Sequence, residues 1–185
     1  MLGTSKNLSS PVVIDPAYHA QLLSAIDEVT AHAGIPKSFL YKSAKEVCSA
    51  KEIEWLSEFR IHKAHNSGGV CIHGQGDRIP SRFMAMAAAL LRNYVHARVI
   101  SLSDFLDQDT DPLDGSVLFI PNFYQSAEGR PLTSWQIQVL YDRLIKRFLG
   151  GKMTVVYVED LPHMAKQYGP LIGDLLNSEF LFFGA

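Results

Sequence analysis

The feature that most constrains the fold is a glycine-rich turn between an apolar run and an amphipathic one, at residues 68–81. The segment reads Gly68-Gly69-Val70-Cys71-Ile72-His73-Gly74-Gln75-Gly76-Asp77-Arg78-Ile79-Pro80-Ser81. Val70 to His73 is apolar enough for a buried strand, and the Ala-, Met- and Leu-rich stretch from Pro80 to Val95 predicts a helix. A strand, a tight turn and a helix in this order are typical of α/β proteins with a parallel sheet.

The same segment has the length of a phosphate-binding loop but lacks its functional residues. The ATP-binding pattern is G-x-x-x-x-G-K-[ST]; Gly74 stands at its first position and Ser81 at its last. Ile79 replaces the second glycine, and Pro80 replaces the lysine that meets the phosphates. Because proline supplies neither the charge nor a backbone N–H, we expect an ATPase-like scaffold without hydrolysis. We expect no catalytic residue, no cofactor and no metal.

The loop keeps only some of the features that bind an anion. The helix N-terminus persists, and an anion would meet the residues of the degenerate loop, namely Gly74, Gly76, Arg78, Ser81 and Arg82. Asp77 opposes this charge. The plainer alternative is a strand-to-helix turn in which Asp77 caps the helix and the arginines are solvated.

The rest of the chain continues the α/β alternation. Further strands are predicted at 98–102, 116–120, 153–158 and 179–183, and helices at 16–33, from 49 to about 65, from 133 to 149 and over 161–176 with a break at Gly169-Pro170. Residues 35–39 are predicted as an extended connector and 104–114 as an acidic connection. The prediction is a three-layer α/β/α sandwich around a parallel five-stranded sheet, preceded by N-terminal helices.

Composition excludes several classes of protein. The 185 residues suffice for one domain, and a net charge of −2 gives no global basic field for nucleic acid. No apolar run approaches the roughly 20 residues of a membrane span, and the start of the chain has no signal-like segment. Cys48 and Cys71 form no disulfide framework, so we expect a reducing, cytoplasmic location.

Read in order, the elements resemble the ATPase core of the DnaC/IstB family, helicase loaders and transposition helper ATPases of the AAA+ class. The resemblance covers about residues 34–185 and rests on three anchors: the lead-in Ala33-Gly34-Ile35-Pro36, the strand and loop at 69–74, and Leu161-Pro162 followed by Tyr168-Gly169. It implies a segment at 1–33 with one helix, then a core at 34–185 without the C-terminal lid. It also implies a P-loop-NTPase-like sheet in the order 5-1-4-3-2.

The departures from that family all remove catalytic groups. Where the resemblance expects two metal-binding acids, the chain has Pro121 and Asn122. Where it expects a small polar pair near the γ-phosphate, the chain has Glu159 and Asp160. Where it expects two arginine fingers, the chain has Leu171 and Leu175. Phosphoryl transfer depends on positioned charge. The resemblance therefore implies a pseudo-ATPase. It would act as an adaptor, assembly or regulatory protein in DNA replication, recombination or a mobile genetic element. An ATPase with rearranged residues is the alternative.

Protein contacts would then carry the function. The apolar run Phe180, Phe182 and Phe183 is expected in an edge strand beside the first strand, where another chain would cover it. The resemblance suggests replication or mobile-element ATPase and helicase components as partners, or a second copy of the chain. Alternatively, the first two helices fold back over this strand.

Two further groups of residues suggest other functions, each with weaker support. Lys37, Lys42, Lys45, Arg60 and Lys63, with Phe39, Tyr41, Trp55 and Phe59 among them, have the composition of a single-stranded nucleic-acid platform, although interspersed glutamates favour a solvated face. His62, His65, Cys71 and His73 are ligand-type residues. Their spacing matches no closed zinc motif.

Overall fold

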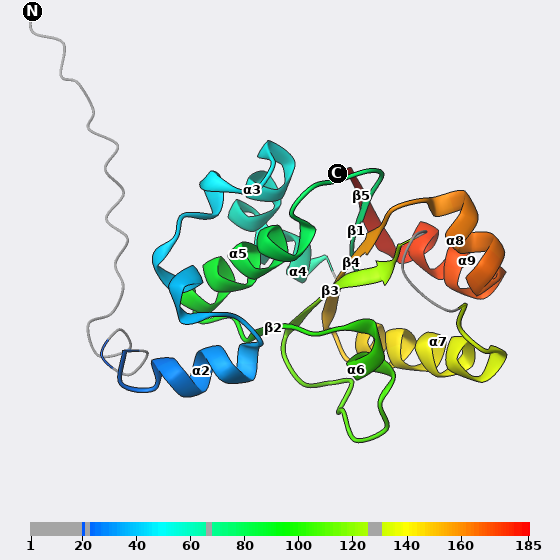
Figure 1. Ribbon diagram of the computed structural model, residues 1–185, viewed down its shortest axis with the longest axis horizontal. Helices are drawn as coiled ribbons and strands as arrows, with labels where there is room; N and C mark the ends of the chain where they lie inside the picture. Colours follow the sequence, from blue (N-terminus) through cyan, green and yellow to red (C-terminus); the bar gives the residue numbers. More distant parts are fainter. Residues whose placement is uncertain (1–19, 21–22, 66–67, 126–130) are drawn as a thin grey trace, which may run out of the picture.

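The protein is built on a five-stranded, all-parallel sheet in the order β2-β3-β4-β1-β5 (Figure 1). The computed structural model describes residues 20, 23–65, 68–125 and 131–185. The strands are β1 Gly69–His73, β2 Ala97–Val99, β3 Val117–Tyr124, β4 Met153–Val158 and β5 Phe180–Gly184. The predicted order 5-1-4-3-2 is confirmed, because β1 lies between β4 and β5 and the latter forms an edge.

Helices cover both faces of this sheet, which makes the predicted three layers (Figure 1). On one face lie α2 Ile26–Ala33, η1 Lys37–Tyr41, α3 Ala50–Ser57, α4 Phe59–Ala64 and α5 Ile79–Arg92, with the short turn η2 Ala44–Glu46 before α3. On the other lie α6 Leu102–Leu106, α7 Ser134–Leu149, α8 Leu161–Tyr168 and α9 Pro170–Glu179. No helix among the described residues is both long and apolar enough to cross a membrane.

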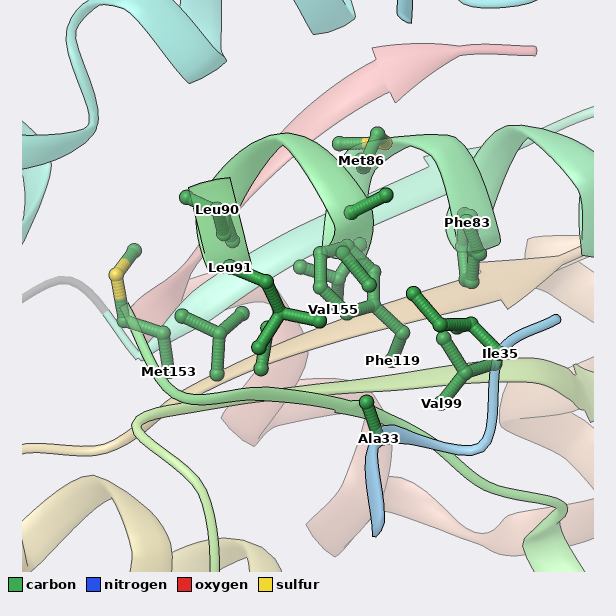
Figure 2. Close-up of a cluster of buried hydrophobic side chains, with 14 of the residues drawn as sticks. Ala33, Ile35, Phe83, Met86, Leu90, Leu91, Val99, Phe119, Met153 and Val155 are labelled. Carbon is green, nitrogen blue, oxygen red and sulfur yellow. The ribbon is translucent and has the colours of Figure 1, made fainter. Parts of the chain in front are cut away.

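The central strand β1 is buried on both faces, as its uninterrupted apolar sequence predicts. Val70 and Ile72 point into the core beneath α5, whereas Cys71 points into the core beneath α6–α9. All three have no exposed surface. Figure 2 shows part of the first core, in which side chains of α5 such as Phe83 lie over the sheet.

Local signals place several helix starts and ends where the sequence predicts them. Ser49 and Thr133 cap α3 and α7 in capping boxes with a glutamate and a glutamine three residues later. Gly34 ends α2 with φ of 67°, and a Cβ there would stand 2.3 Å from the carbonyl oxygen of Val99. Only glycine permits this approach of the α2 turn to β2.

Several element boundaries differ from prediction. The first part of the helix predicted at 16–33 lies outside the described residues, and the second predicted helix is divided at Glu58 into α3 and α4. Residues 37–41 form the 3₁₀ turn η1 rather than an extended connector. The strand predicted at 98–102 is wrong at its end, because β2 stops at Val99 and Leu102 begins α6. This helix extends into the predicted acidic connection; Ser101 caps it, and three of its apolar side chains are buried. The third strand continues beyond Ile120 to Tyr124.

Candidate functional site

The candidate site is the loop between β1 and α5, at the carboxyl end of the central strand. The chain turns at Gly74, whose φ is 97°, and enters α5 after Arg78, whose φ is 52°. Ligands of open parallel sheets bind at the carboxyl ends of strands, and a hollow of about 240 Å³ lies here. Its lining residues are Gly76, Arg78, Ile79, Pro80, Gln125, Tyr157 and Glu159.

A tyrosine that the sequence did not single out bridges the two glycines of this loop. The hydroxyl of Tyr157, on β4, donates to the carbonyl of Gly74 (2.9 Å) and accepts from the N–H of Gly76 (3.3 Å). The N–H of Gly74 donates to the carbonyl of Val158 at 3.1 Å. Two N–H groups that a phosphate-binding loop would offer to an anion are therefore used within the protein. Tyr157 lies level with Ile72 in the register of β4 against β1, and this pairing brings its hydroxyl to the loop.

Arg82, predicted among the anion contacts, lies beneath the loop in a buried ion pair. Its Nη2 is 2.8 Å from Oε1 of Glu52 on α3, and its Nε donates to both carboxylate oxygens at 3.2 and 3.1 Å. The Glu52 side chain is fully buried, and that of Arg82 is 7% exposed. The guanidinium therefore balances a buried carboxylate and ties α5 to α3. The prediction that Arg82 is solvated or contacts an anion is wrong, because folding places Glu52 beside it.

Arg78 supplies the positive charge in the described lining of the hollow. Its side chain is 72% exposed, and its Nε lies 3.4 Å from a carboxylate oxygen of Asp77. Pro80 stands in the first turn of α5 and contributes no N–H. Ser81 is half-buried on α5 and does not belong to the described lining of the hollow. Asp77 does not cap α5 through its side chain, since Arg78 holds the N-cap position.

The end of β3 lies further along the chain than the family resemblance suggested. A register irregularity separates Ile120, opposite Val156, from Tyr124, opposite Val158. Within this irregular stretch, the side-chain oxygen of Asn122 accepts a hydrogen bond from the backbone N–H of Leu102, at 2.8 Å. Consequently Gln125, rather than Asn122 or Pro121, reaches the hollow from β3.

The end of β4 adds negative charge to the site. Glu159 lines the hollow, whereas Asp160 caps α8 by accepting from the N–H of His163 at 2.9 Å. Burial raises the pKa of Tyr124, and the neighbouring Asp160 and Glu159 raise it further. A polyphosphate would be repelled by these carboxylates.

The places of the arginine fingers, assigned by resemblance, hold leucines on α9. Leu171 is 53% exposed, and Leu175 is buried in the core under α6–α9. Neither side chain can stabilise phosphate charge.

The predicted nucleic-acid platform is not assembled. Trp55 and Phe59 are buried in the core beneath α5, and Phe39 is half-buried, so Tyr41 is the exposed aromatic of the four. Lys37 pairs with a carboxylate of α2. The remaining cations, Lys42, Lys45, Arg60 and Lys63, are exposed on separate elements, η1–η2 and α4. Stacking on bases requires exposed aromatic rings, so this surface lacks that feature.

The histidine and cysteine cluster is divided by the sheet. Cys71 is fully buried in the core under α6–α9, while His62 stacks on Trp55, which belongs to the opposite core. The four residues therefore do not lie together in one site. Burial raises the pKa of the Cys71 thiol to about 12.

The edge strand β5 is where the sequence predicts it, but its phenylalanines are unequally exposed. Phe180 is 8% exposed and belongs to the core. Phe182 and Phe183 are half-buried and pack against the two cores from opposite faces of the strand. Phe180 is therefore unavailable to a partner, whereas the other two keep part of their surface.

Comparison with solved structures finds this architecture in a helicase loader and a replication initiation factor. The crystal structure of the DnaC helicase loader gives a TM-score of 0.56 at 13% sequence identity, over 80% of this chain and 99% of that chain. A crystal structure of a DNA replication initiation factor gives 0.53 at 9% identity, over 77% of this chain and 48% of that chain. The fold is AAA+-like. No protein-family model and no curated protein matches the sequence.

Proposed function

We propose that the protein is a non-hydrolysing AAA+-like adaptor or assembly protein that serves DNA replication, recombination or a mobile element through protein contacts. The observation that carries the proposal is the bridge of Tyr157 across the loop glycines, because it uses the polar groups on which nucleotide binding depends. The likeness to a helicase loader and a replication initiation factor supports the biological setting. A cytoplasmic location accords with that role.

The charges around the hollow support the loss of catalysis. Glu159 lines it, and Arg78 with its neighbour Asp77 contributes no net charge. No lysine belongs to the described lining. Catalysis of phosphoryl transfer rests on positioned positive charge and metal ions, so this composition opposes it.

The open edge of β5 supports a role in protein contacts. Within the described sheet, β5 pairs with β1 and has no strand on its other side. Such an edge offers backbone N–H and C=O groups to another chain, and the exposed parts of Phe182 and Phe183 would add apolar contact. The partner we propose is a replication or mobile-element ATPase or helicase component. A second copy of this chain is the alternative occupant.

The first experiment measures ATP hydrolysis with Mg²⁺, with and without single-stranded DNA. We expect no turnover above a control without protein, both for the natural chain and for Pro80→Lys, since restoring a lysine removes neither the tyrosine bridge nor Glu159. Turnover by the natural chain that is abolished by Glu159→Gln, a change in the lining of the hollow, would refute the proposal.

The second experiment follows assembly by light scattering with purified replication helicases and their loaders. We expect a complex that is weakened by Phe183→Asp on β5 and retained in Leu149→Asp, a control at a residue that is 77% exposed on α7. A chain that stays monomeric and binds none of these proteins would count against the adaptor role.

A further inference from the structure

We propose that His32, His96 and Asp114 form a binding site for one divalent transition-metal ion, of which Zn²⁺ is the representative case. His32 lies in the last turn of α2, His96 immediately before β2 and Asp114 shortly before β3. Each offers one ligand atom, and these atoms all lie within 4.8 Å of one another. Because the cluster lies at the amino ends of β2 and β3, away from the β1–α5 loop, the proposal is independent of the proposed function.

The geometry is close to that of a three-ligand zinc site. Nε2 of His32 is 3.3 Å from Oδ2 of Asp114, and the rings of His32 and His96 are stacked with their centroids 5.0 Å apart. Tetrahedral zinc, with its ligand atoms at about 2.0–2.1 Å, holds them roughly 3.3 Å from one another. Side-chain rotation would have to close at most about 1.5 Å. His32, whose side chain is 46% exposed, would make most of this movement, since the carboxylate of Asp114 is held by Arg98.

The backbone of each ligand residue is already fixed by hydrogen bonds. Nε of Arg98 donates to the carbonyl of His32 at 3.0 Å, and Nη1 of Arg147 donates to the carbonyl of Asp114 at 3.1 Å. The carbonyl of His96 accepts at 2.7 Å from a backbone N–H just before β3. Such outer contacts orient ligands and reduce the entropy lost on binding.

The chemistry of the donors suits a borderline metal. Two imidazoles with one carboxylate are typical ligands of zinc, nickel and copper. A neutral imidazole offers a ring-nitrogen lone pair to such an ion, and both His32 and His96 supply one ring nitrogen to the cluster. Arg98 pairs with Oδ2 of Asp114 and opposes a cation. The 3.3 Å contact of His32 is with this same oxygen, so the ion would share Oδ2 with Arg98, which would act as the outer hydrogen-bonding residue that ligating carboxylates normally have.

A bound ion would join three segments that are distant in sequence. It would hold the end of α2 against the starts of β2 and β3, where Gly34 already brings α2 close to Val99. Three protein ligands leave a fourth position for water. Because the folded state alone presents these ligands together, metal binding would stabilise it by mass action.

The test is a calorimetric titration of Zn²⁺ into the full chain after chelator treatment, near neutral pH. We expect one ion per chain, and at least about tenfold weaker binding in His32→Ala, in His96→Ala and in Asp114→Asn. His65→Ala is the matched control, because His65 is an exposed histidine at the end of α4 and far from this cluster in sequence. Its affinity should equal that of the natural chain.

A spectroscopic measurement separates this site from binding by cysteine. Co²⁺ bound to the cluster should give d–d absorption without a thiolate charge-transfer band, and this absorption should be lost in His96→Ala. Absence of binding at millimolar zinc, equal weakening by His65→Ala, or a thiolate band would each overturn the proposal. Circular dichroism of each variant confirms that the fold is retained.

Discussion

Replacing Arg82 by methionine should destabilise the protein severely, because it would leave the carboxylate of Glu52 buried without its counter-charge. Methionine keeps most of the aliphatic length of the side chain, so packing changes little. The loss is the guanidinium, which donates to Glu52 from Nε at 3.2 and 3.1 Å and from Nη2 at 2.8 Å. The fully buried carboxylate would keep the N–H of Ser49, at 2.7 Å.

Breaking a buried pair by removing one partner costs about 3–5 kcal/mol, and we expect a decrease of this size in the free energy of unfolding. Urea denaturation followed by fluorescence measures it, with Trp55, which is 1% exposed on α3, as a local probe. Arg78→Met is the control, since the pair of Arg78 with Asp77 is exposed and should contribute less than about 1 kcal/mol.

The double variant Glu52→Gln/Arg82→Met tests the reason for the loss. Glutamine is neutral and still accepts from Ser49, so the double variant should be more stable than Arg82→Met alone. A loss in Arg82→Met no larger than that in Arg78→Met would refute the reasoning, as would a double variant less stable than the single one. A stable Arg82→Met protein with altered nucleotide binding would assign the arginine to the loop instead.

Three further measurements test other parts of the structure. Tyr157→Phe removes both hydrogen bonds across the loop and should lower the free energy of unfolding by about 1–3 kcal/mol in urea; an unchanged value would mean that the bridge is not formed. Burial raises the pKa of the Cys71 thiol from its ordinary 9.0 to about 12. The unfolded chain therefore loses this proton first, and stability should decline as pH rises from about 9 toward 12, less steeply in Cys71→Ala; equal slopes would contradict this. Gly34→Ala should lower the melting temperature, because its Cβ would stand 2.3 Å from the carbonyl oxygen of Val99, whereas Gly184→Ala, with open space around it, should not; similar values would argue against the close approach.

The sequence predicts the middle of the sheet well because β1 and the first half of β3 carry uninterrupted apolar runs. The run from Val70 to Ile72 is buried on both faces as expected, and the family resemblance correctly placed this strand between the fourth and fifth strands. The aromatic platform, which the interspersed glutamates already made the less favoured alternative, is not formed. Trp55 and Phe59 are four residues apart, which is the spacing of one helical face, and this face is buried.

The site is less predictable because its decisive contacts join distant segments. Nothing near Tyr157 in sequence indicates that its hydroxyl meets Gly74 and Gly76, which are brought there by the pairing of β4 with β1. Arg82 and Glu52 are likewise thirty positions apart. Each looks like a surface charge when only its neighbours are considered. The pairing of charges across helices is a property of the tertiary structure, and local patterns do not encode it.

The position of β1 between β4 and β5 has a consequence for how the chain acquires its structure during synthesis. Gly69 pairs with Thr154 on one side and with Phe180 on the other. When β1 leaves the ribosome, neither neighbouring strand has yet been made. Its apolar side chains therefore remain unpaired while α5, β2, β3 and α7 are translated. Contacts of such long sequence separation form slowly, and until they form, apolar segments that favour aggregation are exposed. We therefore expect the nascent chain to bind chaperones until the strands that pair with β1 have been made. Ribosome-bound chains that stop before residue 180 should be sensitive to protease at β1.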